Sequence, residues 1–163
     1  MAWAFMSATS KPAEVVVPPG GSSLKARAMR LLARREHSRA ELRRKLAPKV
    51  MEGEDLEAVL DDLAARGWLS DARYAEQSIR AKARRYGPIK LAHALRARGV
   101  DEETIAAGFR AAGADGASNL EGVWKTRFKA LPADDRERAS QVRFLQGRGF
   151  ALEDVLRFLK GPR

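Results

Sequence analysis

Apolar residues recur every three or four positions along most of the chain, which is the period of an amphipathic helix. The clearest stretch is residues 67–100. Ser70 is a favourable N-cap, so a helix is predicted to begin at about Asp71. Five residues then form one core-facing stripe at helical spacing: Ala72, Ala75, Ile79, Ala83 and Tyr86.

A glycine-proline pair divides this stretch into two helices. Proline disfavours a helical residue before it but is well accommodated at the first helical position, so Gly87-Pro88 ends one helix and begins another. The second helix carries Leu91 and Leu95 on its apolar side. It is predicted to end at Gly99, because glycine readily adopts the left-handed conformation that follows a helix.

The same period predicts helices on both sides of this stretch. Upstream, an apolar face starts at Leu24, and Ser38 with Glu41 matches a capping box that starts a short helix. Pro48 ends that helix, and a third is expected over about 54–66. Downstream, helices are expected in four segments: Asp101 to about Gly113, Leu120 to Leu131, about Asp134 to Arg148, and a last one containing Val155, Leu156 and Leu159.

These segments group into three helical triplets. Arg98-Gly99-Val100 and Arg148-Gly149-Phe150 lie fifty positions apart and precede similarly spaced apolar pairs. A unit of about 45 to 50 residues buries too little surface to be safely stable alone, so neighbouring units are expected to stack. The predicted fold class is all-α: an elongated tandem array of three three-helix, helix-turn-helix-like repeats with about nine helices. The predicted segments are a disordered leader at 1–23 and repeats at 24–68, 69–113 and 114–163.

The charge of the chain indicates what kind of partner it binds. The formal net charge is +10, which favours polyanionic partners. Residues 24–49 carry ten basic against two acidic side chains and residues 72–98 eight against one, whereas 51–66 and 99–123 are acidic. The chain has no cysteine and no apolar run of membrane-spanning length, so a cytoplasmic protein without membrane contact is expected.

Residues that could carry chemistry are sparse. His37 and His93 are far apart and lack paired metal-ligand spacing, so both are interpreted as ordinary solvated or boundary residues. No phosphate-binding glycine loop is present. The neighbouring carboxylates of Asp61-Asp62 diverge on a helix, which favours a solvated face over a catalytic pair. The chain is therefore predicted to be neither an enzyme nor a cofactor-binding protein.

The basic residues are the candidates for function. Arg73, Arg80 and Arg84 fall on one helical face over a rise of roughly 16 Å, and further cations crowd nearby. Aromatic residues at helical spacing could stack on bases, but core and cap packing is the favoured interpretation for Trp68, Tyr74, Tyr86, Trp124 and Phe128. The contact candidates are Arg27, Arg30, Arg34, Arg39, Arg43, Arg73, Arg80, Lys82, Arg84, Arg85, Lys90, Arg96 and Arg98.

Several runs resemble one known family. They are Gly67-Trp68-Leu69-Ser70-Asp71 with Arg73-Tyr74-Ala75, and Tyr86-Gly87-Pro88 with Lys90-Leu91, Leu95 and Arg98-Gly99-Val100. Ser38-Arg39-Ala40-Glu41-Leu42 with Lys45-Leu46 adds to them. Together they resemble the RecX regulators of bacterial recombination over about residues 24–160. The third repeat departs from the pattern, since it has no Tyr-Gly-Pro equivalent.

This resemblance implies a non-enzymatic modulator of the RecA recombinase. Such a protein would lie in the groove of the RecA-DNA filament, limit its extension and suppress its ATPase and strand exchange. The expected partners are the RecA filament and single- and double-stranded DNA without sequence specificity, and a monomer is expected. No family residue with a known RecA contact is carried over.

Two other functions stay open at this stage. One is a direct DNA-binding regulator of the helix-turn-helix type, although the Ala-rich helix at 91–98 offers few side chains to base edges beyond Arg96 and Arg98. The other is a pure protein-interaction scaffold, for which DNA binding at physiological salt would be negligible.

Overall fold

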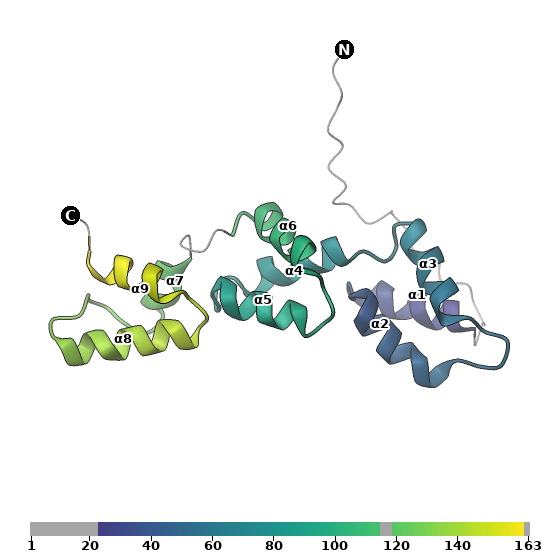
Figure 1. The fold of residues 1–163 in the computed structure, drawn as a ribbon, viewed down its shortest axis with the longest axis horizontal. Helices are drawn as coiled ribbons and strands as arrows, with labels where there is room; N and C mark the ends of the chain where they lie inside the picture. Colours follow the sequence, from purple (N-terminus) through teal and green to yellow (C-terminus); the bar gives the residue numbers. More distant parts are fainter. Residues whose placement is uncertain (1–22, 115–118, 162–163) are drawn as a thin grey trace, which may run out of the picture. The chain divides into compact units, whose positions relative to one another are not determined.

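The computed structural model describes residues 23–114 and 119–161, and within these ranges the chain is entirely helical (Figure 1). The all-α prediction is confirmed, with nine α-helices and one 3-10 helix in the described part. The predicted leader at 1–23 lies outside these ranges apart from Ser23. The elements are α1 Leu24–Arg34, α2 Arg39–Leu46, η1 Ala47–Lys49, α3 Leu56–Ala65, α4 Asp71–Lys82, α5 Pro88–Arg96, α6 Glu102–Ala112, α7 Leu120–Lys125, α8 Asp135–Gly147 and α9 Leu152–Leu159.

Short polar side chains begin most of these helices. Ser38 Oγ accepts a hydrogen bond from the backbone N–H of Glu41, and Asp101 Oδ1 accepts one from that of Thr104. Each bond satisfies an N–H group that has no partner within the helix. The predicted starts of α2 and α6 are therefore confirmed, and Ser23, Asp55 and Asp134 cap α1, α3 and α8 in the same way.

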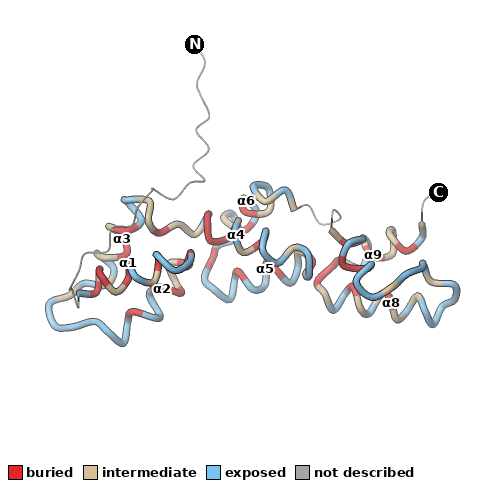
Figure 2. The backbone as a smooth tube through the Cα atoms, turned by 180° about the vertical axis from the view of Figure 1, so that it is seen from behind, coloured by how far each residue is buried: buried red, intermediate tan, exposed pale blue. Residues whose placement is uncertain are grey.

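The first compact unit ends at Tyr74 and has one leucine-rich core. Leu32 of α1, Leu42 of α2 and Leu60 of α3 are each almost completely buried there. Figure 2 shows buried positions on each of α1, α2 and α3, and their side chains form one cluster. The predicted apolar faces of these three helices thus meet as expected for a three-helix bundle.

The second compact unit begins at Ala75. The buried residues Ile79 of α4, Leu91 of α5 and Ile105 of α6 lie in its first half. A separate cluster joins α7, α8 and α9 through Trp124, Leu145 and Val155, among others. The division into two compact units does not test the three predicted repeat boundaries, which remain a prediction.

The predicted bounds of two helices are wrong. The first helix of the 67–100 stretch ends at Lys82, not at Tyr86, because the N–H groups of Arg85 and Tyr86 both donate to the Lys82 carbonyl and tighten the chain into a turn. Ala72, assigned to the core stripe, is exposed. Similarly, α7 ends at Lys125, well before the predicted end at Leu131, and that leucine is 41% exposed.

Candidate nucleic-acid interface

Arg73 does not lie on an exposed face, so the predicted stripe of Arg73, Arg80 and Arg84 is wrong in its first member. The Arg73 side chain is only 8% exposed. Its Nε donates to Glu36 Oε1 at 3.2 Å and its Nη2 donates to the Gly67 carbonyl at 2.8 Å. The first turn of α4 belongs to the core of the first unit, and a cation there needs a buried anion, which Glu36 provides.

The other two members of the stripe are exposed, but in different settings. Arg80 pairs with Glu76 of its own helix at 2.7 Å and also donates to the Ala111 carbonyl at 2.8 Å. Arg84 follows the end of α4 and, within the described residues, has no carboxylate at ion-pair distance. Of the three arginines, Arg84 is therefore the one whose positive charge is not paired with a described carboxylate.

The candidates on α2 are neutralised by α3. Glu57 accepts from Arg43 Nε at 2.5 Å and from Arg39 Nη2 at 2.9 Å, and Asp61 accepts from Arg39 at 2.6 Å. The hydrogen bond from Arg43, followed by that from Arg39, lowers the pKa of Glu57 to about 2. The basic second helix and the acidic third helix of the first repeat thus compensate one another.

The candidates on α1 have a different environment. Arg27, Arg30 and Arg34 line an open hollow of about 180 Å³ together with Leu31 and Lys49, and no carboxylate is among these lining residues. Arg27 Nη1 donates to the Lys49 carbonyl at 3.4 Å, which holds its guanidinium at the rim. Four cations around one hollow favour an anionic ligand such as a phosphate.

The remaining candidates of the predicted second repeat include both paired and unpaired cations within the described residues. Arg96 forms an ion pair with Glu102, with Nη2 and Oε2 at 3.0 Å. Lys82, Arg85 and Lys90 are exposed and have no ion pair with any described carboxylate. Arg98 is exposed as well.

Sequence reasoning missed two cations within the predicted third repeat. Arg127 follows α7 and Arg148 follows α8, and both lie over aromatic rings. The available signals were the net positive charge of residues 124–163 and the Arg-Gly pair at 148–149, which repeats the pair at 98–99. Neither signal could indicate which of the ten cations in that segment would lie beside a ring.

His37 corrects another interpretation, because it is 2% exposed and is not a solvated or boundary residue. Lys45 Nζ lies 3.1 Å from its Nε2, and its Nδ1 lies 3.0 Å from the Arg35 carbonyl. These contacts suit a neutral ring that accepts at Nε2 and donates at Nδ1. Burial lowers the pKa of His37, which keeps the ring neutral.

Two classes of site are not found in the part of the chain that the structure describes. No group of three or more His, Asp and Glu side chains there is arranged to hold a metal ion. No helix there is long and apolar enough to cross a membrane.

Two family models and several relatives match this chain, and they all belong to one family. Residues 25–63 match the family model described as RecX, first three-helix domain, and residues 70–108 match the model described as RecX, second three-helix domain. A protein of Chromobacterium violaceum named regulatory protein RecX is 44% identical over 141 residues, covering 86% of this chain and 91% of its own length. One of Pseudomonas entomophila with the same name is 46% identical over 136 residues, covering 82% and 88%.

Solved structures agree in fold. A crystal structure of regulatory protein RecX superposes with a TM-score of 0.70 at 20% identity, covering 85% of this chain and 72% of that one. The crystal structure of RecX from Lactobacillus salivarius gives a TM-score of 0.65 at 16% identity, covering 84% and 94%.

Proposed function

The chain belongs to the RecX family, and on that premise we propose that it is a non-enzymatic regulator that binds the RecA recombinase and its DNA filament. Binding would limit filament extension and suppress ATPase activity and strand exchange. The proposal includes contact with single- and double-stranded DNA without sequence preference, action as a monomer and location in the cytoplasm. Its relatives' name, regulatory protein, supports the regulatory role.

The observation that carries the DNA part of the proposal is the basic hollow of α1. Four cations line this hollow, and no carboxylate is among the lining residues. The acidic side chains of α3 instead pair with the arginines of α2. Lys and Arg contacts to phosphate do not depend on base sequence, so they suit a partner that coats DNA of any sequence.

A direct DNA-binding regulator remains the alternative, because the matched domains are three-helix domains of the size of a helix-turn-helix. Its recognition helix would be α5. Arg96, one of the two base-reading candidates there, is engaged by Glu102, which disfavours this function. Footprinting separates the two: one protected sequence supports the regulator, and uniform weak protection supports the filament modulator.

The decisive experiment is the RecA ATPase rate on single-stranded DNA, titrated with the protein. The wild-type chain is expected to lower the rate. The double variant R27A/R34A is expected to need about tenfold more protein for the same inhibition, since two phosphate-contacting cations are lost. The matched control is K125A/R157A, which also removes two exposed cations, but ones already paired with carboxylates of their own helices.

A wild-type chain that leaves the ATPase rate unchanged contradicts the proposal. Equal loss of inhibition in the two double variants contradicts the role of the α1 hollow. Circular dichroism and thermal melting of each variant verify that the fold is retained.

A further inference from the structure

The start of α5 and the end of α8 are joined by their backbones within the second unit. The Gly87 N–H donates to the Arg148 carbonyl at 2.8 Å, and the Ile89 N–H donates to the Gly149 carbonyl at 3.0 Å. A Cβ atom at Gly87 would lie 2.5 Å from the Gly149 oxygen, and one at Gly149 would lie 2.4 Å from the Lys90 Cβ. Only glycines permit this approach, which explains the glycine of the Tyr-Gly-Pro run in structural terms.

Cations and aromatic rings alternate across this junction. Arg148 lies over two rings, 5.9 Å from the Tyr86 centroid and 5.0 Å from the Phe144 centroid. Arg127 likewise lies 5.2 Å from Phe144 and 5.8 Å from Phe128. On the other side, Lys90 and Arg85 lie 4.8 Å and 5.9 Å from Tyr86. We call these seven residues the cation-ring ladder: Arg85, Tyr86, Lys90, Arg127, Phe128, Phe144 and Arg148.

The ladder carries positive charge that no described carboxylate compensates. Arg85, Lys90 and Arg127 are exposed and Arg148 is half-buried, yet none has an ion pair within the described ranges. Other exposed cations of the same compact unit do have one: Lys125 pairs with Glu121 at 2.6 Å, and Arg157 pairs with Glu153 at 2.8 Å. The ladder cations are oriented by rings and, for Lys90 and Arg148, by long hydrogen bonds to the Gly147 and Arg85 carbonyls. No described carboxylate takes up their charge, so their remaining N–H groups can bind an anionic ligand.

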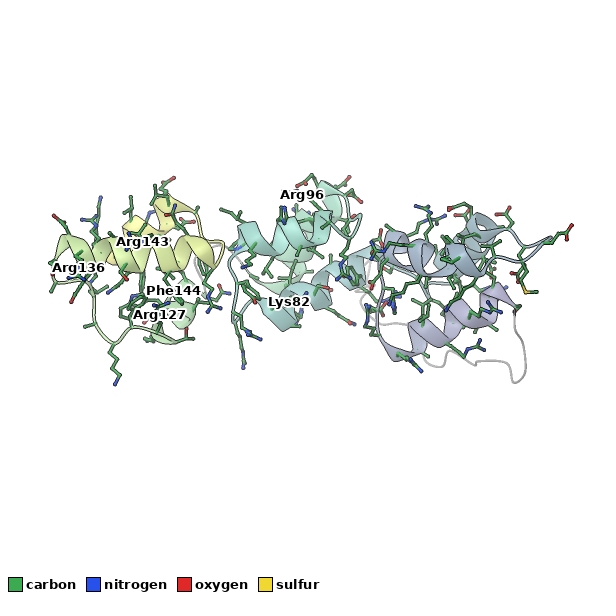
Figure 3. All side chains as sticks on the ribbon, turned by 90° about the horizontal axis from the view of Figure 1, so that it is seen from below. Lys82, Arg96, Arg127, Arg136, Arg143 and Phe144 are labelled. Atoms are coloured by element: carbon green, nitrogen blue, oxygen red, sulfur yellow. The ribbon has the colours of Figure 1, made fainter. Side chains whose placement is uncertain are left out.

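The rings fix the direction in which the ladder faces. Phe128 and Phe144 are half-buried because they pack against the core of α7, α8 and α9. They meet edge to face with centroids 5.4 Å apart. The arginines lie on these anchored rings, and Figure 3 shows Arg127 beside Phe144. Arg85 and Arg127 are exposed, so their guanidinium groups are accessible to a ligand, whereas Arg148 is half-buried and contacts two rings.

We propose that the cation-ring ladder is a binding site for single-stranded nucleic acid. The guanidinium edges and the Lys90 ammonium bind backbone phosphates, while the outer guanidinium planes stack on unpaired bases. A single strand is favoured over a duplex because only unpaired bases offer their faces to planar side chains. The inference rests on the proposed function, since it names the surface that would hold the strand of a filament, but it is tested without RecA.

The test is fluorescence anisotropy of a labelled oligothymidylate strand titrated with the whole chain. R127A/R148A is expected to weaken binding about tenfold and to make the log-log salt slope less steep by about 1.4, which corresponds to two lost phosphate contacts. The matched control R136A/R143A removes two exposed arginines of α8 that lie over no ring (Figure 3). It is expected to change the affinity less than about twofold, because surface charges away from contacts act weakly.

Equal weakening by both double variants overturns the inference, because it would show diffuse charge attraction. An equal loss of duplex and single-strand affinity in R127A/R148A also overturns it, because the ladder is expected to hold unpaired bases. If circular dichroism shows that R127A/R148A does not fold, R127K/R148K keeps the charge and removes the planar group. That variant is expected to lose single-strand affinity relative to R136K/R143K, and unchanged affinity overturns the inference.

The strand-binding experiment and the RecA ATPase experiment can fail separately. If the wild-type chain inhibits the RecA ATPase and R127A/R148A binds the free strand with wild-type affinity, the proposed function stands and the ladder proposal is wrong. If R127A/R148A weakens strand binding and the wild-type chain does not affect the RecA ATPase, the ladder proposal stands and the proposed function is wrong.

Discussion

At the scale of single residues, three charged side chains buried in the first unit are held in two ion pairs. Arg73 is paired with Glu36 at 3.2 Å where both are nearly excluded from water. Glu41, 2% exposed, accepts from Arg35 Nη2 at 2.5 Å and from Nη1 at 3.2 Å. A buried charge is stable only while its partner is present, so these residues are sensitive points for stability.

Replacing Arg73 is expected to destabilise the fold and not merely to weaken binding. Arg73→Ala leaves the Glu36 carboxylate buried without its guanidinium, so the free energy of unfolding should fall by about 3–5 kcal/mol. Urea denaturation followed by circular dichroism measures this change. Arg84→Ala, at an exposed site in a turn, is the control and should change stability by less than about 0.5 kcal/mol.

A similar stability for both variants would show that the Arg73 ion pair is not formed. Glu36→Gln combined with Arg73→Met removes both charges. It should recover part of the loss, because the cost comes from the unpaired charge and not from the missing contact.

Acidification is expected to destabilise the first unit in two steps. Burial lowers the pKa of His37 below its ordinary 6.5, so the unfolded chain takes up that proton first, and stability is lost as the pH falls below about 6.5. The hydrogen bond from Arg35 lowers the pKa of Glu41 from 4.5 to about 2, so its contribution is complete above pH 4.5 and disappears as the pH approaches 2.

Thermal melting across this pH range measures both steps. Glu41→Gln is expected to remove the lower step, of about 1–3 kcal/mol, and to leave the upper one. A variant that keeps the full loss below pH 4.5 would contradict the assignment to Glu41.

At the scale of elements, the helices are short and depend on their ends. The α5 helix has only nine residues, and its first turn is anchored by the backbone bonds between Gly87, Ile89 and the Arg148-Gly149 pair. Gly149 also has a φ of +95°, which residues with a side chain rarely adopt. One residue therefore serves both to end α8 and to permit contact with α5.

Gly149→Ala is expected to disrupt this contact. The new Cβ would lie 2.6 Å from the Lys90 backbone nitrogen, so the backbones must separate, and the positive φ adds about 1–2 kcal/mol of strain. Amide hydrogen exchange of Ile89 should accelerate in this variant, and the melting temperature should fall.

Gly147→Ala is the control, because a Cβ atom there meets nothing within 4 Å and its position is helical. It should be neutral or slightly stabilising. Equal effects of the two substitutions would show that the contact between α5 and α8 is not formed in solution.

At the scale of the whole molecule, the net charge of +10 overstates the charge that is available. Pairs such as Arg43 with Glu57 and Arg96 with Glu102 neutralise much of it locally. Two groups of cations lie where the described residues show no carboxylate among the lining or ring-contacting side chains: the α1 hollow and the cation-ring ladder. Each of these two surfaces can be described within its own compact unit.

Binding of a single strand is expected to depend steeply on salt. If the four ladder cations each hold one phosphate, the log-log slope is about −2.8, and affinity falls about 50-fold between 50 and 200 mM salt. Anisotropy titrations at several salt concentrations give the slope directly. A slope near zero would exclude phosphate contact as the basis of binding.

The residue pattern alone determined the all-helical fold, the approximate position of each helix, two N-caps and the resemblance to the family. Ser38 and Ser70 cap the helices that they were predicted to cap, because capping and helical period are local properties of a few neighbouring residues. The ends of α4 and α7 were missed, since the turns after them are set by nearby backbone bonds that override the apolar spacing.

Which cations are free could be decided only by the tertiary structure. Arg73 and Arg84 occupy the same face of a helical projection, yet one is buried against Glu36 and the other is exposed. For several charges the neighbour that matters is distant in sequence: Glu36 lies 37 positions from Arg73, and Arg148 lies over Tyr86. Electrostatic neutralisation and ring stacking depend on distance in space, which helical periodicity does not encode.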